Sequence, residues 1–353
     1  MSAIDAIISQ LMPSSSSLIG LDIGASSIKV CEVNGNKVEK FYMIPLSEAA
    51  IIEDEIQKTE EIVAKIKRAM EEAGIRGKNV AMGLQGPNTL VKRMQVPEGN
   101  DDEVEDHILW ESEQYIPFGA DDSQISHFII GENEGGGKDV VLTAAREDTI
   151  LSFEKTVETA GYQAKVVEIS SLSLSNLFEH CYSDKLKVYN NGACLIDFGA
   201  QSTKIVIYRA GAPIFCKEIL IGGVLVTEEI QRQMGVSYEE AEDLKINGDQ
   251  SGNLPEEIMT IVDEHLAVLF EDVKKSLNFF MSGSGEQKLE ICLITGGHSR
   301  LPGLAEGLKN IIDIDVNYFD AFRKFKTSKL SEEEKNIFSA QGMIALGLSL
   351  RSL

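Results

Sequence analysis

Positive charge, clustered metal-binding side chains and long apolar runs are all scarce in this sequence. Its 33 Lys and Arg residues stand against 56 Asp and Glu residues, for a formal net charge of −23, and so acidic a chain repels a polyanion. No apolar run reaches the roughly 20 residues of a membrane helix, and the N-terminus lacks the basic region that begins a secretion signal. We therefore expect a protein that does not bind nucleic acid, span a membrane or leave the cell.

The cysteines and histidines show no spacing that predicts a metal site. The five cysteines have no CxxC spacing, and none of the five histidines has metal-ligand spacing to another. Most of the cysteines lie in apolar, strand-like runs, which is typical of reduced core residues and favours a cytoplasmic location.

The length of the chain, 353 residues, exceeds what one hydrophobic core supports, so several subdomains around a cleft are expected. At the N-terminus, residues 1–17 combine isoleucines and a leucine at helical spacing with Pro13 and a serine run. This pattern predicts a short tethered amphipathic helix that docks on a partner protein or a membrane. With one acidic residue and no Lys or Arg, it suits an anionic lipid surface poorly.

The order of predicted elements suggests a duplicated α/β protein with an insertion. Residues 18–43 predict an antiparallel meander, 55–72 a helix and 80–84 a strand, and the strands and helices predicted after residue 188 repeat this order. Between these two regions, the predicted strands and helices of residues 85–165 indicate a small α/β insertion. The predicted divisions are an N-terminal helix and linker (1–17), a first lobe (18–84 plus 166–188), the insertion (85–165), a second lobe (189–222 plus 282–353) and a helical subdomain (223–281).

The strongest signal is a repeated element, Asp22-Ile-Gly-Ala-Ser-Ser-Ile-Lys-Val and Asp197-Phe-Gly-Ala-Gln-Ser-Thr-Lys-Ile. Each copy places an Asp at the end of a strand and a Gly-Ala-x-Ser turn after it. Such a turn lets backbone N–H groups and hydroxyls reach phosphate oxygens, while the Asp meets a metal ion through water. Either copy alone is equally explained as a plain hairpin turn, but the matched pair favours a clamp on one triphosphate. We interpret Lys29 and Lys204 as solvated strand lysines.

Two further elements have both a functional and a structural interpretation. An apolar strand runs into Gly296-Gly297-His298-Ser299, where paired glycines would let the backbone pass under a flat base; the same pattern is also a common strand-to-helix connection. We expect His298 to be a surface or capping residue. Glu242 and Lys245 lie one helical turn apart, and without other information they form a solvated ion pair. The tract Gly135-Gly136-Gly137-Lys138 resembles a phosphate loop, but it opens no helix, so we predict a hairpin turn.

In this order, the elements resemble the nucleotide site of the superfamily of actin, DnaK-type chaperones and sugar kinases. The resemblance implies an α/β fold, the actin-like two-lobed ATPase fold with a duplicated ribonuclease-H-like βββαβα unit, and ATP or ADP with Mg²⁺ as ligand. Glu242 and Lys245 match the helix that contacts base and ribose in bacterial actins. The implied metal-binding residues are Asp22 and Asp197. The implied nucleotide-binding residues are Asp22, Gly24, Ala25, Ser26, Ser27, Lys29, Asp197, Gly199, Ala200, Ser202, Thr203, Gly222, Gly223, Glu242, Lys245, Gly296, Gly297 and Ser299.

The insertion is similar to that of one family, because Ile108-Leu-Trp-Glu-Ser-Glu-Gln-Tyr-Ile-Pro-Phe118 resembles the hallmark of the PilM family of type IV pilus assembly. The resemblance implies a cytoplasmic scaffold that is recruited to the inner membrane by the N-terminal peptide of PilN. Contacts with pilus motor ATPases and self-association are further possibilities. The implied partner-binding residues are Trp110, Tyr115, Ile116, Pro117 and Phe118. From the residues alone, Trp110, Ile116 and Phe118 are each better explained as core of the insertion.

One departure from the superfamily concerns hydrolysis. After the strand at 164–169 the family usually has Glu-Pro, whereas this chain has Ser170-Ser171, and a serine is no strong base. Glu168 and Ser170 are the candidate catalytic residues that remain, so we expect ATP binding with weak or absent hydrolysis. Two alternatives are a small-molecule kinase, which needs a general base, and an FtsA-like division protein, which expects a basic C-terminal helix that 344–353 lacks.

Overall fold

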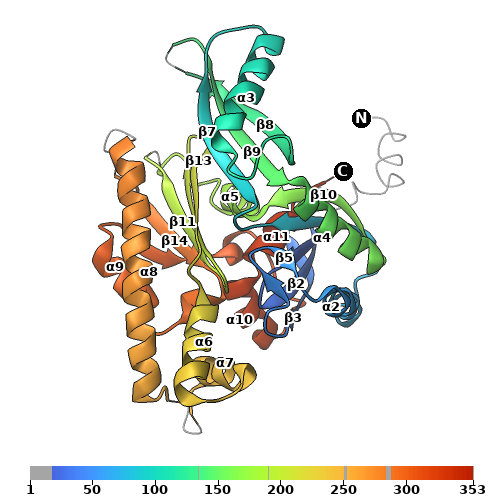
Figure 1. Cartoon of the computed structure of the whole chain (residues 1–353), viewed down its shortest axis with the longest axis vertical. Helices are drawn as coiled ribbons and strands as arrows, with labels where there is room; N and C mark the ends of the chain where they lie inside the picture. Colours follow the sequence, from blue (N-terminus) through green and yellow to red (C-terminus); the bar gives the residue numbers. More distant parts are fainter. Residues whose placement is uncertain (1–17, 134, 190, 250–252, 284–287, 353) are drawn as a thin grey trace.

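The structure is a computed structural model, and it describes residues 18–133, 135–189, 191–249, 253–283 and 288–352 (Figure 1). The predicted N-terminal helix, 1–17, lies outside the described residues. Within the described ranges, no helix is both long enough and apolar enough to cross a membrane.

The first lobe is built on a five-stranded sheet in the order β10-β6-β1-β2-β3. β1 pairs antiparallel with β2 and parallel with β6. Every residue of β1 is buried because helices cover both faces of the sheet, which explains why this strand is apolar throughout except at its Asp. The strands are β1 (Ile19–Ile23), β2 (Ser27–Asn34), β3 (Lys37–Pro45), β6 (Asn79–Leu84) and β10 (Gln163–Ile169).

The second lobe repeats this sheet in the order β13-β12-β11-β14-β15. β11 again pairs antiparallel with the next strand and parallel with β14. The predicted duplication is therefore confirmed at the level of strand order and direction. The strands are β11 (Ala193–Phe198), β12 (Thr203–Arg209), β13 (Ala212–Ile219), β14 (Ile291–Thr295) and β15 (Val316–Tyr318).

Two helices lie between the sheets and join the lobes, α5 (Ser170–Cys181) and α11 (Met343–Ser349) (Figure 1). One buried apolar cluster includes residues of both helices and of both sheets. α11 approaches β1 so closely that a Cβ atom on Gly20 would lie 1.8 Å from the carbonyl oxygen of Ala345. The shared core holds the lobes together along one side, which leaves the other side to form a cleft.

Helices α2 and α4 pack on the outer face of the first sheet, and α8 and α9 pack on that of the second. In Figure 1 the second lobe extends into a helical region made of α6, α7 and the lower part of α8. The helices are α2 (Thr59–Glu72), α4 (Glu147–Thr159), α6 (Gly223–Met234), α7 (Tyr238–Asn247), α8 (Glu256–Gly283), α9 (Leu304–Ile311) and α10 (Glu332–Gln341), with 3₁₀ turns η1 (Gly297–Arg300) and η2 (Ala321–Arg323).

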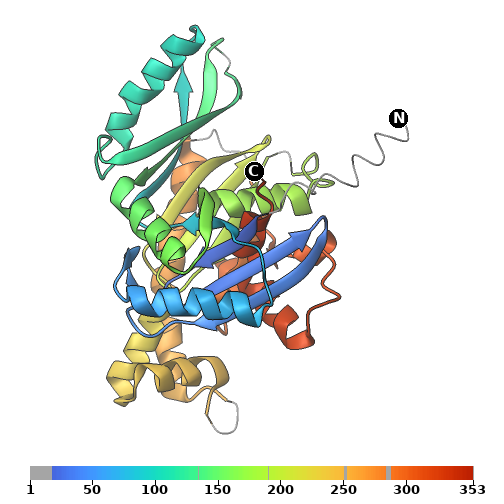
Figure 2. The ribbon, with the colours of Figure 1, turned by 90° about the vertical axis from the view of Figure 1, so that its right-hand side faces the viewer.

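The insertion projects from the body of the molecule (Figures 1 and 2). Its antiparallel sheet has the order β7-β9-β8, with β7 (Thr89–Val96), β8 (Ser123–Glu132) and β9 (Lys138–Arg146). The helix α3 (Asp101–Tyr115) begins at an Asn100–Glu103 capping box and packs on this sheet. The glycine tract lies in the turn between β8 and β9, as predicted. The Asn133 side chain stabilises this turn by accepting hydrogen bonds from the Gly135 and Gly137 N–H groups.

One predicted boundary is wrong in a way that matters for the cleft. The helix expected from residue 55 begins at Thr59, because Ile51–Ile52 (β4) and Glu55–Ile56 (β5) form a small hairpin before it. The two turn residues, Glu53 and Asp54, both have positive φ, at 47° and 67°. Positive φ at both central positions is characteristic of a type I′ turn. Asn-Gly is the usual sequence signal of a type I′ turn, so the Glu53-Asp54 sequence did not predict this turn.

Candidate functional site

A cavity of about 910 Å³ lies between the two sheets. Both Asp-x-Gly hairpins line it, as do α7 and the glycines after β14. The predicted residues that line it are Asp22, Gly24, Ser26, Ser27, Lys29, Asp197, Gly199, Ala200, Ser202, Gly223, Glu242, Lys245, Gly296 and Gly297. The predicted residues outside its lining are Ala25, Thr203, Gly222, Ser299, Glu168 and Ser170.

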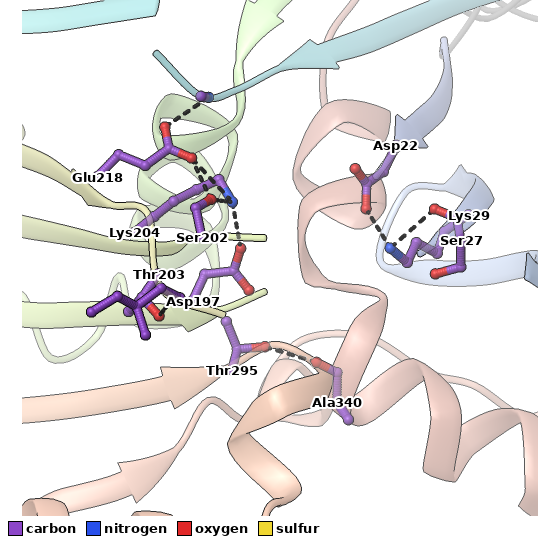
Figure 3. Close-up of polar contacts among 12 residues, drawn as sticks. Asp22, Ser27, Lys29, Asp197, Ser202, Thr203, Lys204, Glu218, Thr295 and Ala340 are labelled. Atoms are coloured by element: carbon purple, nitrogen blue, oxygen red, sulfur yellow. Dashed lines mark hydrogen bonds and ion pairs between the residues drawn. The ribbon is translucent and has the colours of Figure 1, made fainter. Parts of the chain in front are cut away.

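In the first hairpin, a lysine and an aspartate form a buried pair. Lys29 Nζ lies 3.3 Å from Asp22 Oδ2 and donates to the Ser27 carbonyl oxygen at 3.4 Å (Figure 3). The prediction of a solvated lysine is therefore wrong for Lys29, because residues Asp22 and Lys29 face each other in the β1–β2 register. The Ser27 hydroxyl is buried and has no hydrogen-bond partner among the described residues.

The second hairpin carries the equivalent pair within a larger network. Lys204 Nζ lies 3.5 Å from Asp197 Oδ2 and 4.0 Å from Glu218 Oε1, and Ser202 Oγ donates to the same Glu218 oxygen (Figure 3). Lys204 is buried, so the solvated interpretation is wrong here too. Burial alone would lower its pKa, but Asp197, Glu218 and more distant carboxyl groups raise the pKa above its ordinary value.

The centre of the cavity has an excess of acidic groups. The carboxylates of Asp22, Asp197 and Glu218 face two ammonium groups, from Lys29 and Lys204, and burial raises the pKa of a further carboxyl group, that of Asp54, to about 8. This balance suits a divalent cation as an additional ligand. In the described ranges, no three His, Cys, Asp or Glu side chains gather as a ready metal site. A cation would therefore depend on water and on ligand oxygens, as Mg²⁺ commonly does.

At the far end of the cavity, the glycines after β14 come close to the second hairpin. Gly296 has φ of 92°, and a Cβ atom there would lie 2.2 Å from the Phe198 carbonyl oxygen. His298 is buried, contrary to the prediction of a surface or capping residue, and its Nε2 lies 2.9 Å from Nε2 of His265. Burial, followed by the neighbouring His and by Lys245, lowers the pKa of His298 to about 3, so this ring is neutral.

The Glu242–Lys245 pair on α7 also lines the cavity. The Lys245 side chain is only 10% exposed, so the interpretation as a solvated pair is wrong. Its Nζ donates to Glu242 Oε2 at 2.6 Å, to Thr227 Oγ1 at 2.7 Å and to the Gly223 carbonyl oxygen at 3.1 Å. Burial lowers the pKa of Lys245, and Glu242 opposes this shift.

The two catalytic candidates lie away from the cavity. The Glu168 carboxylate accepts hydrogen bonds from Ser173 Oγ at 2.7 Å and Asn176 Nδ2 at 3.0 Å and lies 3.5 Å from Arg351 Nε. Burial raises its pKa, and Arg351 opposes the shift. The Ser170 hydroxyl is buried without a hydrogen-bond partner in the described part of the chain. Neither residue lines the cavity.

In the insertion, the predicted partner residues divide into buried and exposed ones. Ile116 is buried, as the core interpretation predicts, whereas Trp110 is 61% exposed and contradicts it. Tyr115 donates to Glu111 Oε1 at 2.7 Å and lies under Lys92 Nζ. Pro117 is exposed and Phe118 half-buried.

Sequence reasoning missed the contacts that cross the cleft. Gly86 N–H, in the turn between β6 of the first lobe and β7 of the insertion, donates to Glu218 Oε2 of the second lobe at 2.7 Å. Gln201 Nε2, in the second hairpin, donates to the Ile51 carbonyl oxygen of the β4–β5 hairpin at 2.7 Å. Asp54, in the turn of that hairpin, lines the cavity as well. Because these contacts pair residues more than 100 positions apart, no local pattern signals them.

Comparison with known proteins identifies the fold and the family. The family profile described as "Type IV pilus assembly protein PilM" matches residues 20–353. A solved chain from a "PilM-PilN type IV pilus biogenesis complex" superposes with a TM-score of 0.82 at 23% identity, over 96% of this chain and 99% of that one. MreB5 of Spiroplasma citri bound to ADP has a TM-score of 0.52 at 12% identity, over 91% and 98%. Cell division protein FtsA of Enterococcus hirae is 23% identical over 85% of this chain and 77% of its own length. The fold is actin-like and two-lobed, as predicted.

Proposed function

This chain belongs to the PilM family of type IV pilus assembly proteins, and we propose that it is an ATP-binding scaffold whose nucleotide state governs how it holds a pilus partner. The observation that carries this proposal is the pair of Asp-x-Gly hairpins, which line one cavity from opposite lobes. A ligand that contacts both hairpins draws the lobes together, so it selects a closed conformation. The related MreB5 fold has been solved with ADP.

The residues of the cavity fit a nucleotide with a divalent cation. The unpartnered Ser27 hydroxyl and the turn after Asp22 would donate to phosphate oxygens, and the turn after Asp197 would do so from the other side. Asp22 and Asp197 would hold Mg²⁺ through water, which offsets the acidic excess. Gly296 and Gly297 would lie under the base, and Glu242 with Lys245 beside the ribose.

We propose that hydrolysis is slow or absent. The superfamily carboxylate after β10 is replaced by Ser170, which cannot act as a strong base. The nearest acidic side chain along the chain, Glu168, is held by Ser173, Asn176 and Arg351 outside the cavity. Nucleotide would then act by its occupancy more than by turnover.

We further propose that the insertion binds the N-terminal cytoplasmic peptide of a PilN-type inner-membrane protein, which would recruit this chain to the cytoplasmic face of that membrane. The support is an apolar surface on α3, where Leu109 is 48% and Trp110 61% exposed. Large exposed aromatic side chains commonly anchor peptide and protein partners. The solved PilM-PilN complex shows that a chain of this fold is found with PilN.

The nucleotide proposal is tested by isothermal titration of the purified, nucleotide-free protein with ATP and ADP in the presence of Mg²⁺. We expect saturable binding that weakens when Asp22 or Asp197 is changed to Asn. No binding of either nucleotide at millimolar concentration would refute the proposal.

The partner proposal is tested separately by capture on an immobilised N-terminal PilN-type peptide. Trp110→Ala should weaken capture by about tenfold or more, since exposed aromatic anchors commonly contribute over 1 kcal/mol to binding. Phe279→Ala is the matched control, because Phe279 is 75% exposed on α8 in the other lobe. Equal capture by Trp110→Ala and the wild type would show that the peptide binds elsewhere.

A further inference from the structure

A buried carboxyl group with an unpartnered oxygen lies in the cavity, at Asp54 in the β4–β5 turn. The residue is only 7% exposed, and its Oδ2 has no hydrogen-bond partner among the described residues. Buried polar atoms without partners are costly and therefore rare in folded proteins. The oxygen lacks a partner in the described chain, so a ligand that enters the cavity could supply one.

The surroundings of Asp54 form a built site that involves both lobes. A Cβ atom on Gly86 would lie 1.7 Å from Asp54 Oδ2, so the carboxyl group packs directly against the Gly86 backbone. The Gly86 N–H donates to Glu218 Oε2 across the cleft at 2.7 Å. Asp54 of the first lobe and Glu218 of the second thus both contact Gly86. Gly86 has φ of 85°, so a larger residue at this position would strain the backbone.

This site lies at the end of the cavity away from the glycines that would hold the base. Gly296 lies next to Asp197, because a Cβ atom on it would contact Asp197 Oδ1. Lys204 contacts both Asp197 and Glu218, so Glu218 lies one residue farther from Gly296 than Asp197 does. In Figure 3, Glu218 and Thr295, the residue before Gly296, lie on opposite sides of Asp197. A triphosphate with its base near Gly296 therefore points its terminal phosphate toward the Glu218 end.

The β4–β5 hairpin is also attached to the second phosphate hairpin, through the hydrogen bond from Gln201 to the Ile51 carbonyl oxygen. Its turn is therefore held near the position where the phosphates would lie. Gly199, Gln201 and Asp54 line the same cavity.

The charges around Asp54 determine whether its carboxyl group can donate a hydrogen bond. Burial has the largest effect and raises the pKa of Asp54, and the negative charges of Glu218 on β13 and of the neighbouring Glu53 raise it further. The positive charge of Lys204 on β12 lowers it. The resulting pKa is about 8. Near pH 7 the group is therefore protonated. A protonated carboxyl donates to a phosphate oxygen, whereas an ionised one would repel it.

We propose that Asp54 donates its carboxyl hydrogen to the terminal phosphate of a bound nucleoside triphosphate and so lets the cleft distinguish a triphosphate from a diphosphate. This inference rests on the proposed nucleotide function. A diphosphate does not extend to Asp54, so its affinity is independent of this side chain.

The experiment compares the affinities of a non-hydrolysable β,γ-imido analogue of ATP and of ADP, each with Mg²⁺, by isothermal titration at about pH 7 and about pH 9.5, on either side of the titration of Asp54. The variants are Asp54→Asn, which keeps a donor, and Asp54→Gly, which removes the side chain. Both residues tolerate positive φ. Glu55→Gln is the matched control, because Glu55 is exposed in the same hairpin and does not line the cavity.

In the wild type, the ratio of triphosphate to diphosphate affinity should fall about tenfold between the two pH values, as expected for the loss of one hydrogen bond to a charged group. Asp54→Asn should keep the ratio at both pH values, Asp54→Gly should lower it at both, and Glu55→Gln should behave like the wild type. As an independent readout, carboxyl NMR of the nucleotide-free protein should show Asp54 titrating near pH 8.

Three outcomes would overturn the proposal. The wild-type ratio could be independent of pH, or Asp54→Gly could keep the wild-type ratio. Triphosphate binding near pH 7 could also release a proton from the wild type that Asp54→Asn does not release, which would mean that Asp54 ionises instead of donating. Normal ADP binding in each of these cases would leave the nucleotide function intact. Absence of binding by either nucleotide in the wild type would instead refute both.

Discussion

The two Asp-x-Gly hairpins have nearly the same sequence and the same strand register, but they lie in different surroundings. In the first, Lys29 contacts Asp22 and the hairpin's own backbone. In the second, Lys204 contacts Asp197 and also reaches Glu218, which accepts a hydrogen bond from across the cleft. The register pairs Asp with Lys in both copies, so this divergence comes from the neighbours and not from the hairpins.

The difference indicates that the two copies of the duplicated element have different roles. The first hairpin leaves the Ser27 hydroxyl without a partner, whereas the corresponding Ser202 hydroxyl is bound to Glu218. The first copy therefore has unused hydrogen-bonding capacity for a ligand. The second copy is part of the contact between the lobes, so a ligand bound there also acts on that contact.

The largest difference between the copies is expected on removal of each lysine. Lys204→Met leaves Asp197 and Glu218 without their buried cation and should lower the free energy of unfolding by about 3–5 kcal/mol. Lys29→Met leaves one carboxylate, which borders the cavity, and should cost about 2 kcal/mol. Urea unfolding at neutral pH measures both, and equal losses would show that the second network adds nothing to stability.

Next in size is the effect of Asp54, which belongs to the surroundings of the second copy. The folded protein keeps the Asp54 proton up to about pH 8, whereas the unfolded chain loses it near the ordinary pKa of 3.8. Its favourable contribution is therefore complete below pH 4 and is lost as pH rises toward 8. Asp54→Asn, which does not titrate, should be more stable than the wild type by about 4 kcal/mol at pH 7 and by little at pH 4.

Thermal or urea unfolding across that pH range checks this expectation. Glu55→Gln is the control, because Glu55 is exposed in the same hairpin and should change stability by no more than about 0.5 kcal/mol. A variant Asp54→Asn that is less stable than the wild type at pH 7 would contradict the assignment of a raised pKa to Asp54.

The two serines should separate ligand binding from stability. Ser202→Ala breaks a hydrogen bond to Glu218 and should cost about 1–2 kcal/mol of stability. Ser27→Ala removes an unpartnered hydroxyl, so it should change stability by about 0.5 kcal/mol or less but weaken nucleotide binding by about tenfold. Unfolding and titration calorimetry on the same two variants give both quantities. A stability loss in Ser27→Ala as large as in Ser202→Ala would mean that Ser27 has a structural partner.

The smallest contrast concerns the hairpin glycines. A Cβ atom on Gly199 would lie 2.8 Å from the Ser202 carbonyl oxygen, whereas on Gly24 the nearest atom is the end of the Lys29 side chain, at 3.1 Å. Gly199→Ala should therefore cost about 1 kcal/mol and Gly24→Ala a few tenths. The reverse order in urea unfolding would indicate that the first hairpin is the more tightly packed of the two.

Several features of the site could be predicted because they depend on local chemistry or on repetition. The two hairpins, the glycines at 296 and 297 and the turn at 135–137 each follow from turn residues between apolar strands, and the structure contains all of them. The burial of Lys29 and Lys204 was predicted wrongly, because strand alternation alone does not show that both faces of a sheet are covered. The exposed Trp110 was also compatible with a core position until α3 could be placed on its sheet.

Residue order along the chain is enough to identify the α/β class, the duplication, the insertion and the two Asp-x-Gly hairpins, since each depends on hydrophobic period, turn chemistry or a repeated motif. The folded molecule was needed to bring Asp54, Gly86 and Glu218 together, to place His265 against His298 and to direct Glu168 away from the cavity. These are contacts between segments distant in the chain, and packing decides them, along with the pKa values that depend on burial.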